Sequence, residues 1–286
     1  MNRALEGRRV MNALKKIAKE ARGSSINELR MIVALERAVA RLENHPRLSS
    51  HIVFKGGFVL LKTIDTSRFT RDVDALAIGI SRERVSEMVA RALKLDLDDG
   101  LWFGDIKTED LVDQGSYGGY RFNCAFQIGD PPKEESKIKK LSRIHIDMGF
   151  GDPVEVIPAK RPMTSILPDG KPVSWSVYPL EYIFAEKLEA LFSRGSANSR
   201  AKDVYDMPIV FLECKDKQKL RKAVLRTFSH RSTPVPDSFE SGARSFDLSV
   251  LRSAWRSVEL TEQTQSFEET WDELLGCLGR LDRIRD

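Results

Sequence analysis

Two aspartates separated by a single residue constrain this chain more than any other feature of its sequence. Asp72 and Asp74 lie in segment 70–76, which is otherwise mostly apolar after Arg71. Side chains alternate between the two faces of a strand, so both carboxylates would face the same side. Carboxylates held this close repel each other unless a proton or a cation lies between them. Because Mg²⁺ prefers such oxygen ligands, the pair is interpreted as a divalent-metal platform, with an exposed edge strand as the alternative.

A third acidic residue lies in a second predicted strand, over residues 143–148. The apolar residues of this segment share one face: Ile144, Ile146 and Met148. His145 and Asp147 share the other face. An unpaired charge in an apolar run is costly to bury, so Asp147 is expected to join the first two aspartates in a three-carboxylate site. The alternative is a strand with one wet face on which Asp147 simply lies.

A double-glycine turn precedes the aspartate pair. Residues 52–54 read as a strand that runs into Lys55, Gly56 and Gly57, and an apolar helix follows. Glycines let backbone N–H groups approach an anion closely, and the start of a helix favours negative charge. The turn is therefore a candidate cradle for a triphosphate, although an ordinary strand-to-helix turn would have the same sequence.

The order of elements predicts an α+β fold: a mixed sheet flanked by helices, followed by a helical domain. Helices are expected over 2–21 and 26–42, where Ser24 or Ser25 suits the N-cap position. Further strands are expected at 73–78, 120–128 and 154–157, with a helix over 81–95 and a solvated loop over 133–140. From Pro179 onward the pattern is helical, over 180–193, 201–212, 216–228, 248–258 and 267–281, with a loop over 232–245. These changes place the domains at 1–178 and 179–286.

The helical part carries a second polar cluster. Lys187 adjoins an apolar stripe on its helix, so its stem is expected to be partly buried. Asp203 and Asp206 are three residues apart, close to one face of the next helix. Lys187 could contact a phosphate. Asp203 could orient Lys187 or accept a proton from an attacking hydroxyl. A solvated pair of helices joined by salt bridges is the alternative.

Taken together, the motifs resemble a known family. The succession of Gly-Gly turn, helix, Asp-x-Asp strand and later single-Asp strand is the layout of the nucleotidyltransferase superfamily related to DNA polymerase β. Within it, the chain resembles the AbiEii/AbiGii-type toxin nucleotidyltransferases over about residues 50–212. The matching positions are Lys55-Gly56-Gly57, Arg68 to Asp74, Asp147, Glu186-Lys187 and Lys202 to Asp206.

The resemblance implies roles for individual residues. It makes Asp72 and Asp74 catalytic ligands of Mg²⁺ or Mn²⁺ and gives Asp147 the third acidic position. It makes Lys187 and Asp203 the catalytic residues of the helical half. The residues implied to bind the NTP are Lys55, Gly56, Gly57, Arg68 and Thr70.

The resemblance also implies a biological role: the toxin of a toxin–antitoxin pair. Such an enzyme would transfer NMP from an NTP to an RNA 3′ end, with the tRNA acceptor stem as the expected target. Pyrophosphate would be released and translation would stop. The implied partners are the NTP, the RNA and a cognate antitoxin protein.

Three other functions remain open on the residues alone. The same core would serve a small-molecule nucleotidyltransferase of the aminoglycoside-modifying type. The same acids would serve a metal-dependent phosphohydrolase or nuclease. A non-catalytic binding module would use them only for structure.

Charge, cysteine content and hydropathy indicate which partners and which cellular compartment to expect. The 286 residues carry a net charge of only +4, so the distribution of charge matters more than its sum. A basic segment over 215–231 is interpreted either as a track for RNA phosphates or as a solvated helix face. Three cysteines without metal-ligand spacing are expected to be reduced and buried. No apolar run reaches the roughly 18–20 residues of a membrane span and no secretory signal is seen, so we expect no membrane partner and a cytoplasmic protein.

Overall fold

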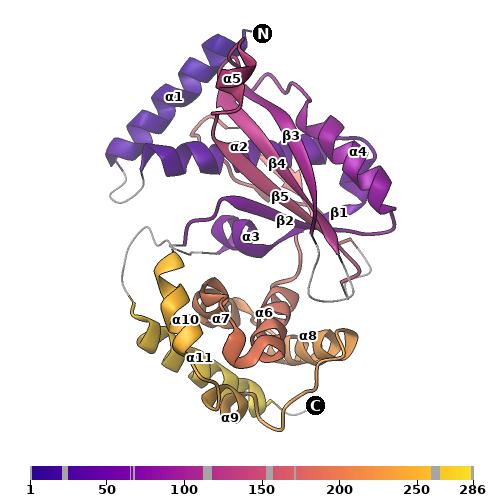
Figure 1. The fold of residues 1–286 in the computed structure, drawn as a ribbon, viewed down its shortest axis with the longest axis vertical. Helices are drawn as coiled ribbons and strands as arrows, with labels where there is room; N and C mark the ends of the chain where they lie inside the picture. The colour runs from indigo at the N-terminus through magenta and orange to yellow at the C-terminus, as the bar shows by residue number, and fades with distance from the viewer. Residues whose placement is uncertain are drawn as a thin grey trace. The chain divides into compact units, whose positions relative to one another are not determined.

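A computed structural model describes residues 2–20, 25–64, 66, 68–111, 118–152, 157–170, 172–258 and 265–284 (Figure 1). The chain forms two compact units. The first comprises residues 1–65 and 69–177, and the second comprises residues 66–68 and 178–286. No helix among the described residues combines the length and the apolar character needed to cross a membrane.

A five-stranded mixed sheet is the centre of the first unit. Its strands lie in the order β1-β2-β5-β4-β3. β2 and β5 are parallel, and the other neighbouring pairs are antiparallel. The strands are β1 (Ile52–Lys55), β2 (Asp72–Ala77), β3 (Leu101–Leu111), β4 (Gly119–Ile128) and β5 (Arg143–Phe150). A separate hairpin pairs β6 (Arg161–Met163) with β7 (Val173–Trp175). The predicted α+β class is confirmed.

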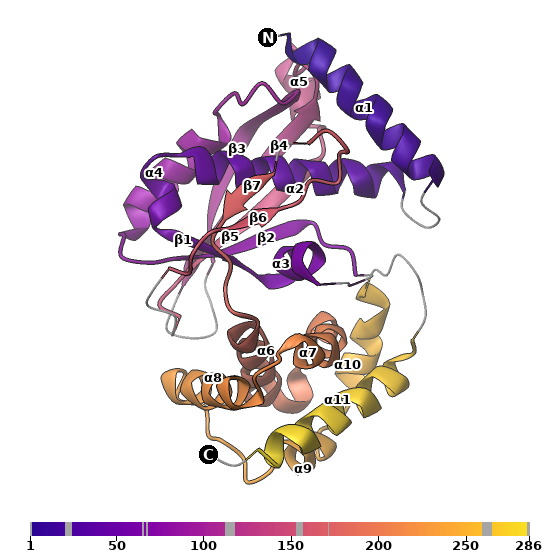
Figure 2. The same ribbon diagram turned by 180° about the vertical axis from the view of Figure 1, so that it is seen from behind.

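The helices of this unit are α1 (Arg3–Glu20), α2 (Ile26–Asn44), α3 (Gly56–Thr63), α4 (Arg82–Leu93) and α5 (Glu135–Ile138), with a 3-10 turn, η1, at Leu48–Ser50. A capping box between Ser25 and Glu28 starts α2 and satisfies two backbone N–H groups that a helix leaves unpaired. α2 then crosses one face of the sheet, where it contacts β2 and β5, and Figure 2 shows it in front of the strands. The apolar sides of the strands lie under this cover, so the polar sides face the other way.

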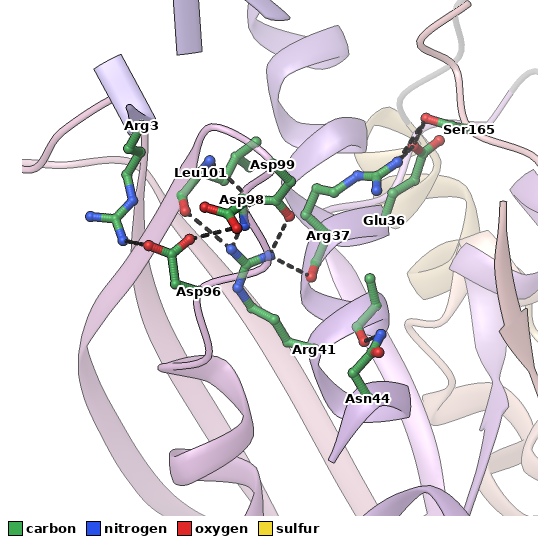
Figure 3. Close-up of polar contacts among 11 residues, drawn as sticks. Arg3, Glu36, Arg37, Arg41, Asn44, Asp96, Asp98, Asp99, Leu101 and Ser165 are labelled. Carbon is green, nitrogen blue, oxygen red and sulfur yellow. Dashed lines mark hydrogen bonds and ion pairs between the residues drawn. The ribbon is translucent and has the colours of Figure 1, made fainter. Parts of the chain in front are cut away.

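One charged side chain of α2, that of Arg41, anchors the segment that leads into β3 (Figure 3). The guanidinium of Arg41 is 1% exposed and donates to both carboxylate oxygens of Asp99, at 2.7 and 2.9 Å. It also donates to the carbonyl oxygen of Leu101 and stacks over the ring of Phe103. A buried charge needs such partners, because an unpaired one would cost several kcal/mol. Arg41 therefore sets where β3 begins.

The second unit is built from helices packed on a core of aliphatic and aromatic side chains. Its helices are α6 (Leu180–Arg194), α7 (Ala201–Glu213), α8 (Lys217–His230), α9 (Phe239–Arg244), α10 (Ser249–Ala254) and α11 (Phe267–Asp282), with 3-10 turns η2 (Gly195–Ala197) and η3 (Trp255–Ser257). α6 packs on α7 and α8, and α11 packs on α7 and α9. The ring of Phe192 contacts those of Phe228, Phe239 and Phe246.

Several elements differ from the sequence-based expectation. β3 was not predicted, because its outer half is an exposed edge rich in charged residues and is interrupted by a bulge at Asp105, whose φ is 43°. The loop predicted over 232–245 contains α9, which is short but is capped by Ser238. The loop predicted over 133–140 contains the exposed turn of helix α5. The predicted strand at 154–157 lies almost entirely outside the described residues.

Candidate active site

β2 presents the aspartate pair as the alternation predicts. Val73 and Ala75 are at most 1% exposed, whereas Asp72 and Asp74 are partly accessible. The two carboxylates therefore lie on the sheet face opposite the packed side of β2.

Asp74 lies directly against the start of α3. Gly56 has a φ of +74°, in the region that favours glycine. A Cβ atom at this position would lie 2.7 Å from Cγ of Asp74 and closer still to its Oδ2. The glycine thus makes room for the carboxylate, and the N-terminus of α3, which includes Gly57, places partial positive charge beside it.

A row of four charged residues runs across the sheet. Strand register pairs Asp74 with Lys55 on β1 and with Asp147 on β5, and it pairs Asp147 with Arg121 on β4. Residues paired in register point to the same face. The row therefore consists of two carboxylates, Asp74 and Asp147, with the cations Lys55 and Arg121 at its two ends. Lys55 also forms an ion pair with Asp152.

Asp147 is held by a two-pronged interaction with Arg121. Nε donates to Oδ1 at 2.8 Å and Nη2 donates to Oδ2 at 2.6 Å. These bonds raise the pKa of the guanidinium further above its ordinary value, and the charges of Asp72 and Asp74 act in the same direction. Beside this row, Nδ1 of His145 lies 3.1 Å from Oδ1 of Asp72.

Asp72 and Asp74 fit a divalent cation as two hard-oxygen ligands that leave positions for water and substrate oxygens. Asp147, the third predicted ligand, is paired with Arg121 in this arrangement. Across the described part of the chain, no group of three or more His, Cys, Asp or Glu side chains is placed to hold a metal ion.

Two further predicted nucleotide-binding residues differ in their surroundings. Thr70 is 7% exposed, and its hydroxyl lies 3.4 Å from both the N and the O atoms of Asp72, so it supports the turn into β2. Arg68 belongs to the second unit and is 6% exposed. Its Nε and Nη2 donate to the two carboxylate oxygens of Asp206 at 2.8 and 2.9 Å.

The second unit contains a buried charge network around Lys187. Nζ of Lys187 pairs with Asp203 and lies 2.9 Å from Oδ2 of Asp206. Arg200 pairs with the other oxygen of Asp203. The four buried members of the network are Arg68, Lys187, Asp203 and Asp206.

The network sets the charge state of its members. Burial alone would lower the pKa of Lys187, but the carboxylates of Asp203 and Asp206 outweigh burial and raise it. Burial likewise opposes ionisation of Asp203, and the neighbouring Lys187 and Arg200 lower its pKa below the ordinary value of 3.8. Lys187 is therefore a fixed cation, and Asp203 is a weak base while this pair is intact.

Sequence reasoning missed Arg121 as a member of the first cluster, whereas the helical spacing already placed Asp206 beside Asp203 in the second. The alternation in β4 was a usable signal, because Arg121 interrupts apolar residues with the same period as Asp147 does in β5. That these two strands are neighbours was not available from either segment.

The basic segment is less open than its sequence suggests. Nζ of Lys217 donates to the carbonyl oxygens of Phe211 and Cys214 and lies over the ring of Phe211. Arg231 pairs with Glu189 at 2.8 Å. Two of its cations therefore serve the packing of the second unit.

Comparison with known protein families also points to a nucleotidyltransferase. A family model described as "Nucleotidyl transferase AbiEii toxin, Type IV TA system" matches residues 37–276. No curated protein matches the sequence significantly.

Solved structures resemble the chain at low sequence identity. JHP933 from Helicobacter pylori is 17% identical with a TM-score of 0.53, and the match covers 91% of this chain and 93% of that one. A second H. pylori protein, titled a putative nucleotidyltransferase, is 18% identical with a TM-score of 0.51, covering 91% of this chain and 96% of that one. At these identities the likeness shows the fold alone.

Proposed function

This chain belongs to the AbiEii family of nucleotidyl transferase toxins, and we propose that it transfers a nucleotide from an NTP to an RNA 3′-hydroxyl. The acceptor end of tRNA is the proposed target. The observation that carries the proposal is the placement of the Asp72 and Asp74 carboxylates on one sheet face, with Asp74 seated against Gly56. This arrangement puts two metal ligands beside a helix N-terminus that favours phosphate.

In the proposed reaction, the 3′-oxygen of the acceptor attacks the α-phosphorus of the NTP. A new O–P bond forms, the bond between the α-phosphorus and the bridging oxygen breaks, and pyrophosphate leaves. The hydroxyl proton passes to a base. Mg²⁺ or Mn²⁺ bound at Asp72 and Asp74 would supply charge neutralisation at the phosphates. The remaining task of the protein is positioning, as is general for phosphoryl transfer.

Lys187 and Asp203 are proposed to be required for the reaction, as the family resemblance implies. The network keeps the ammonium of Lys187 charged despite burial, because two carboxylates lie beside it. The low pKa of Asp203 favours a role in orienting Lys187 over a role as the base.

The proposed biological outcome is a block of translation in the cytoplasm. An altered acceptor end cannot be charged with an amino acid, so the modified tRNA would be lost to protein synthesis. The family assignment also supports a cognate antitoxin protein as a partner.

The test incubates purified protein with Mg²⁺, total RNA and each α-labelled NTP in turn, followed by sequencing of the labelled RNA. We expect label at RNA 3′ ends, release of pyrophosphate, and a loss of about two orders of magnitude or more in Asp72→Asn and Asp74→Asn. Correct folding of each variant is checked by circular dichroism and thermal unfolding.

Two results would contradict the proposal. A folded Asp72→Asn protein with full transfer activity would show that Asp72 and Asp74 are not the catalytic metal ligands. Label found in small molecules but never in RNA would show that RNA is not the acceptor.

A further inference from the structure

The third acidic position of the site carries its own cation. Both oxygens of Asp147 accept hydrogen bonds from Arg121, at 2.6 and 2.8 Å. Such a fork is the strongest common geometry for a carboxylate with an arginine, and it fixes the plane of the guanidinium. A metal ion on Asp147 would have to lie beside this positive charge or displace it.

The charge balance of the cluster agrees with a two-carboxylate metal site. Asp72, Asp74, Asp147 and the guanidinium of Arg121 together carry a net charge of −2, which one divalent cation would balance. Asp147 is therefore better explained as the partner of Arg121 than as a ligand.

Arg121 keeps donors for another partner. Its fork to Asp147 uses Nε and Nη2, and no described residue accepts a hydrogen bond from Nη1. The side chain is 36% exposed, on the same face as Asp72 and Asp74, and it interacts electrostatically with both. A guanidinium anchored on one edge and open on the other is suited to a phosphate oxygen.

Resting on the proposed function, we propose that Arg121 contacts a phosphate of the bound NTP and that Asp147 positions Arg121 instead of serving as a third metal ligand. The anchoring matters because a guanidinium already held in place loses little freedom when it binds phosphate. Arg121 would then be a phosphate-binding side chain of the site, and the metal ligands would be limited to the carboxylates of Asp72 and Asp74.

The first arm of the test measures binding of Mn²⁺ alone, from the electron paramagnetic resonance signal of the free ion. We expect Asp72→Asn to weaken binding about tenfold or more, whereas Asp147→Asn and Arg121→Gln stay within about threefold of the unchanged protein. Weakening in Asp147→Asn equal to that in Asp72→Asn would make Asp147 a ligand and overturn the proposal.

The second arm measures binding of inorganic tripolyphosphate in Mg²⁺ by calorimetry, so it needs neither the correct base nor catalysis. We expect Arg121→Gln and Asp147→Asn each to weaken binding about tenfold, with the double variant no weaker than Arg121→Gln. Arg121→Lys should lie between, since it keeps the charge and loses the fork. Unchanged binding in Arg121→Gln would overturn the phosphate contact.

Arg82 provides the matched control. It is 40% exposed and pairs with Asp110, but it lies over the ring of Tyr120, which points to the other face of β4. Arg82→Gln should leave both binding curves unchanged, and every variant is first shown to unfold at a temperature close to that of the unchanged protein.

The two arms separate this inference from the proposed function. Equal Mn²⁺ binding by Asp72→Asn and the unchanged protein would refute the metal pair of the proposed function, and the tripolyphosphate arm would still decide the role of Arg121. Loss of Mn²⁺ binding in both Asp72→Asn and Asp147→Asn would refute only the inference.

Discussion

Asp74 packs so closely against Gly56 that its carboxylate occupies the space where a side chain at position 56 would lie. Gly56→Ala would therefore both strain a backbone at φ +74° and push Asp74 aside. We expect a loss of at least about 1 kcal/mol in the free energy of unfolding. Transfer activity should fall by about tenfold or more, because a metal ligand would be displaced.

Gly276→Ala is the control for that substitution. Gly276 is exposed within α11, and a Cβ there would meet nothing within 4 Å. We expect a gain of about 0.5–1 kcal/mol in stability and unchanged activity. Denaturant unfolding and initial rates provide both readouts, and equal behaviour of the two alanine variants would contradict the role given to Gly56.

Acid sensitivity is predicted from Asp203. Its pKa is lower in the folded protein than the ordinary 3.8, so the unfolded chain binds the proton more readily. The stabilisation from this carboxylate is thus complete above about pH 4 and is lost as the pH falls through the lower folded value. Urea unfolding of the unchanged protein and Asp203→Asn should show a stability difference that is constant above about pH 5 and shrinks as the pH falls below about 4. Parallel pH curves for the two proteins would rule out this linkage.

Arg68 is predicted to act on stability. Arg68→Ala leaves the buried carboxylate of Asp206 without its two-pronged partner, and we expect a loss of about 3–5 kcal/mol. Arg68→Lys should lose less, because it keeps the charge but not the fork. Arg91→Ala, which removes an exposed pair with Glu87, should change nothing measurable. A folded Arg68→Ala protein of normal stability that binds NTP poorly would instead favour the nucleotide-binding role.

The three cysteines are predicted to be unreactive in the folded protein. All three are buried, and burial raises the pKa of Cys124 and Cys214 to about 12 and that of Cys277 in the same direction. At about pH 8 almost no thiolate is present to attack a disulfide reagent. Ellman's reagent should therefore react with all three only after denaturation, while an added exposed thiol in Ser253→Cys should react at once. Rapid reaction of the unchanged protein would contradict the burial of these thiols.

Much of the fold was predictable from the alternation of apolar and polar residues within single segments. The segments around Asp72 and Asp147 are strands with apolar residues on one face and acids on the other, because the side-chain period of a strand is visible in sequence. The amphipathic pattern around Lys187 likewise located α6.

Pairing between distant segments was not predictable in the same way. The contact of Arg121 with Asp147 depends on β4 lying next to β5 in one register, and nothing in either segment specifies its neighbour. β3 escaped prediction because an edge strand tolerates charges that a central strand excludes. Lys187 was expected to bury only its stem, whereas Asp203 and Asp206 allow the ammonium itself to be buried.

The attachment of residues 66–68 to the helical unit limits how this protein can change by recombination. Arg68 comes from a segment just before β2, yet its carboxylate partner, Asp206, lies in α7. A gene exchange that replaced only residues 178–286 would bring in a new α7 while keeping the old Arg68. Any such chimera would need a matching acid at position 206, so the two stretches are expected to be inherited together.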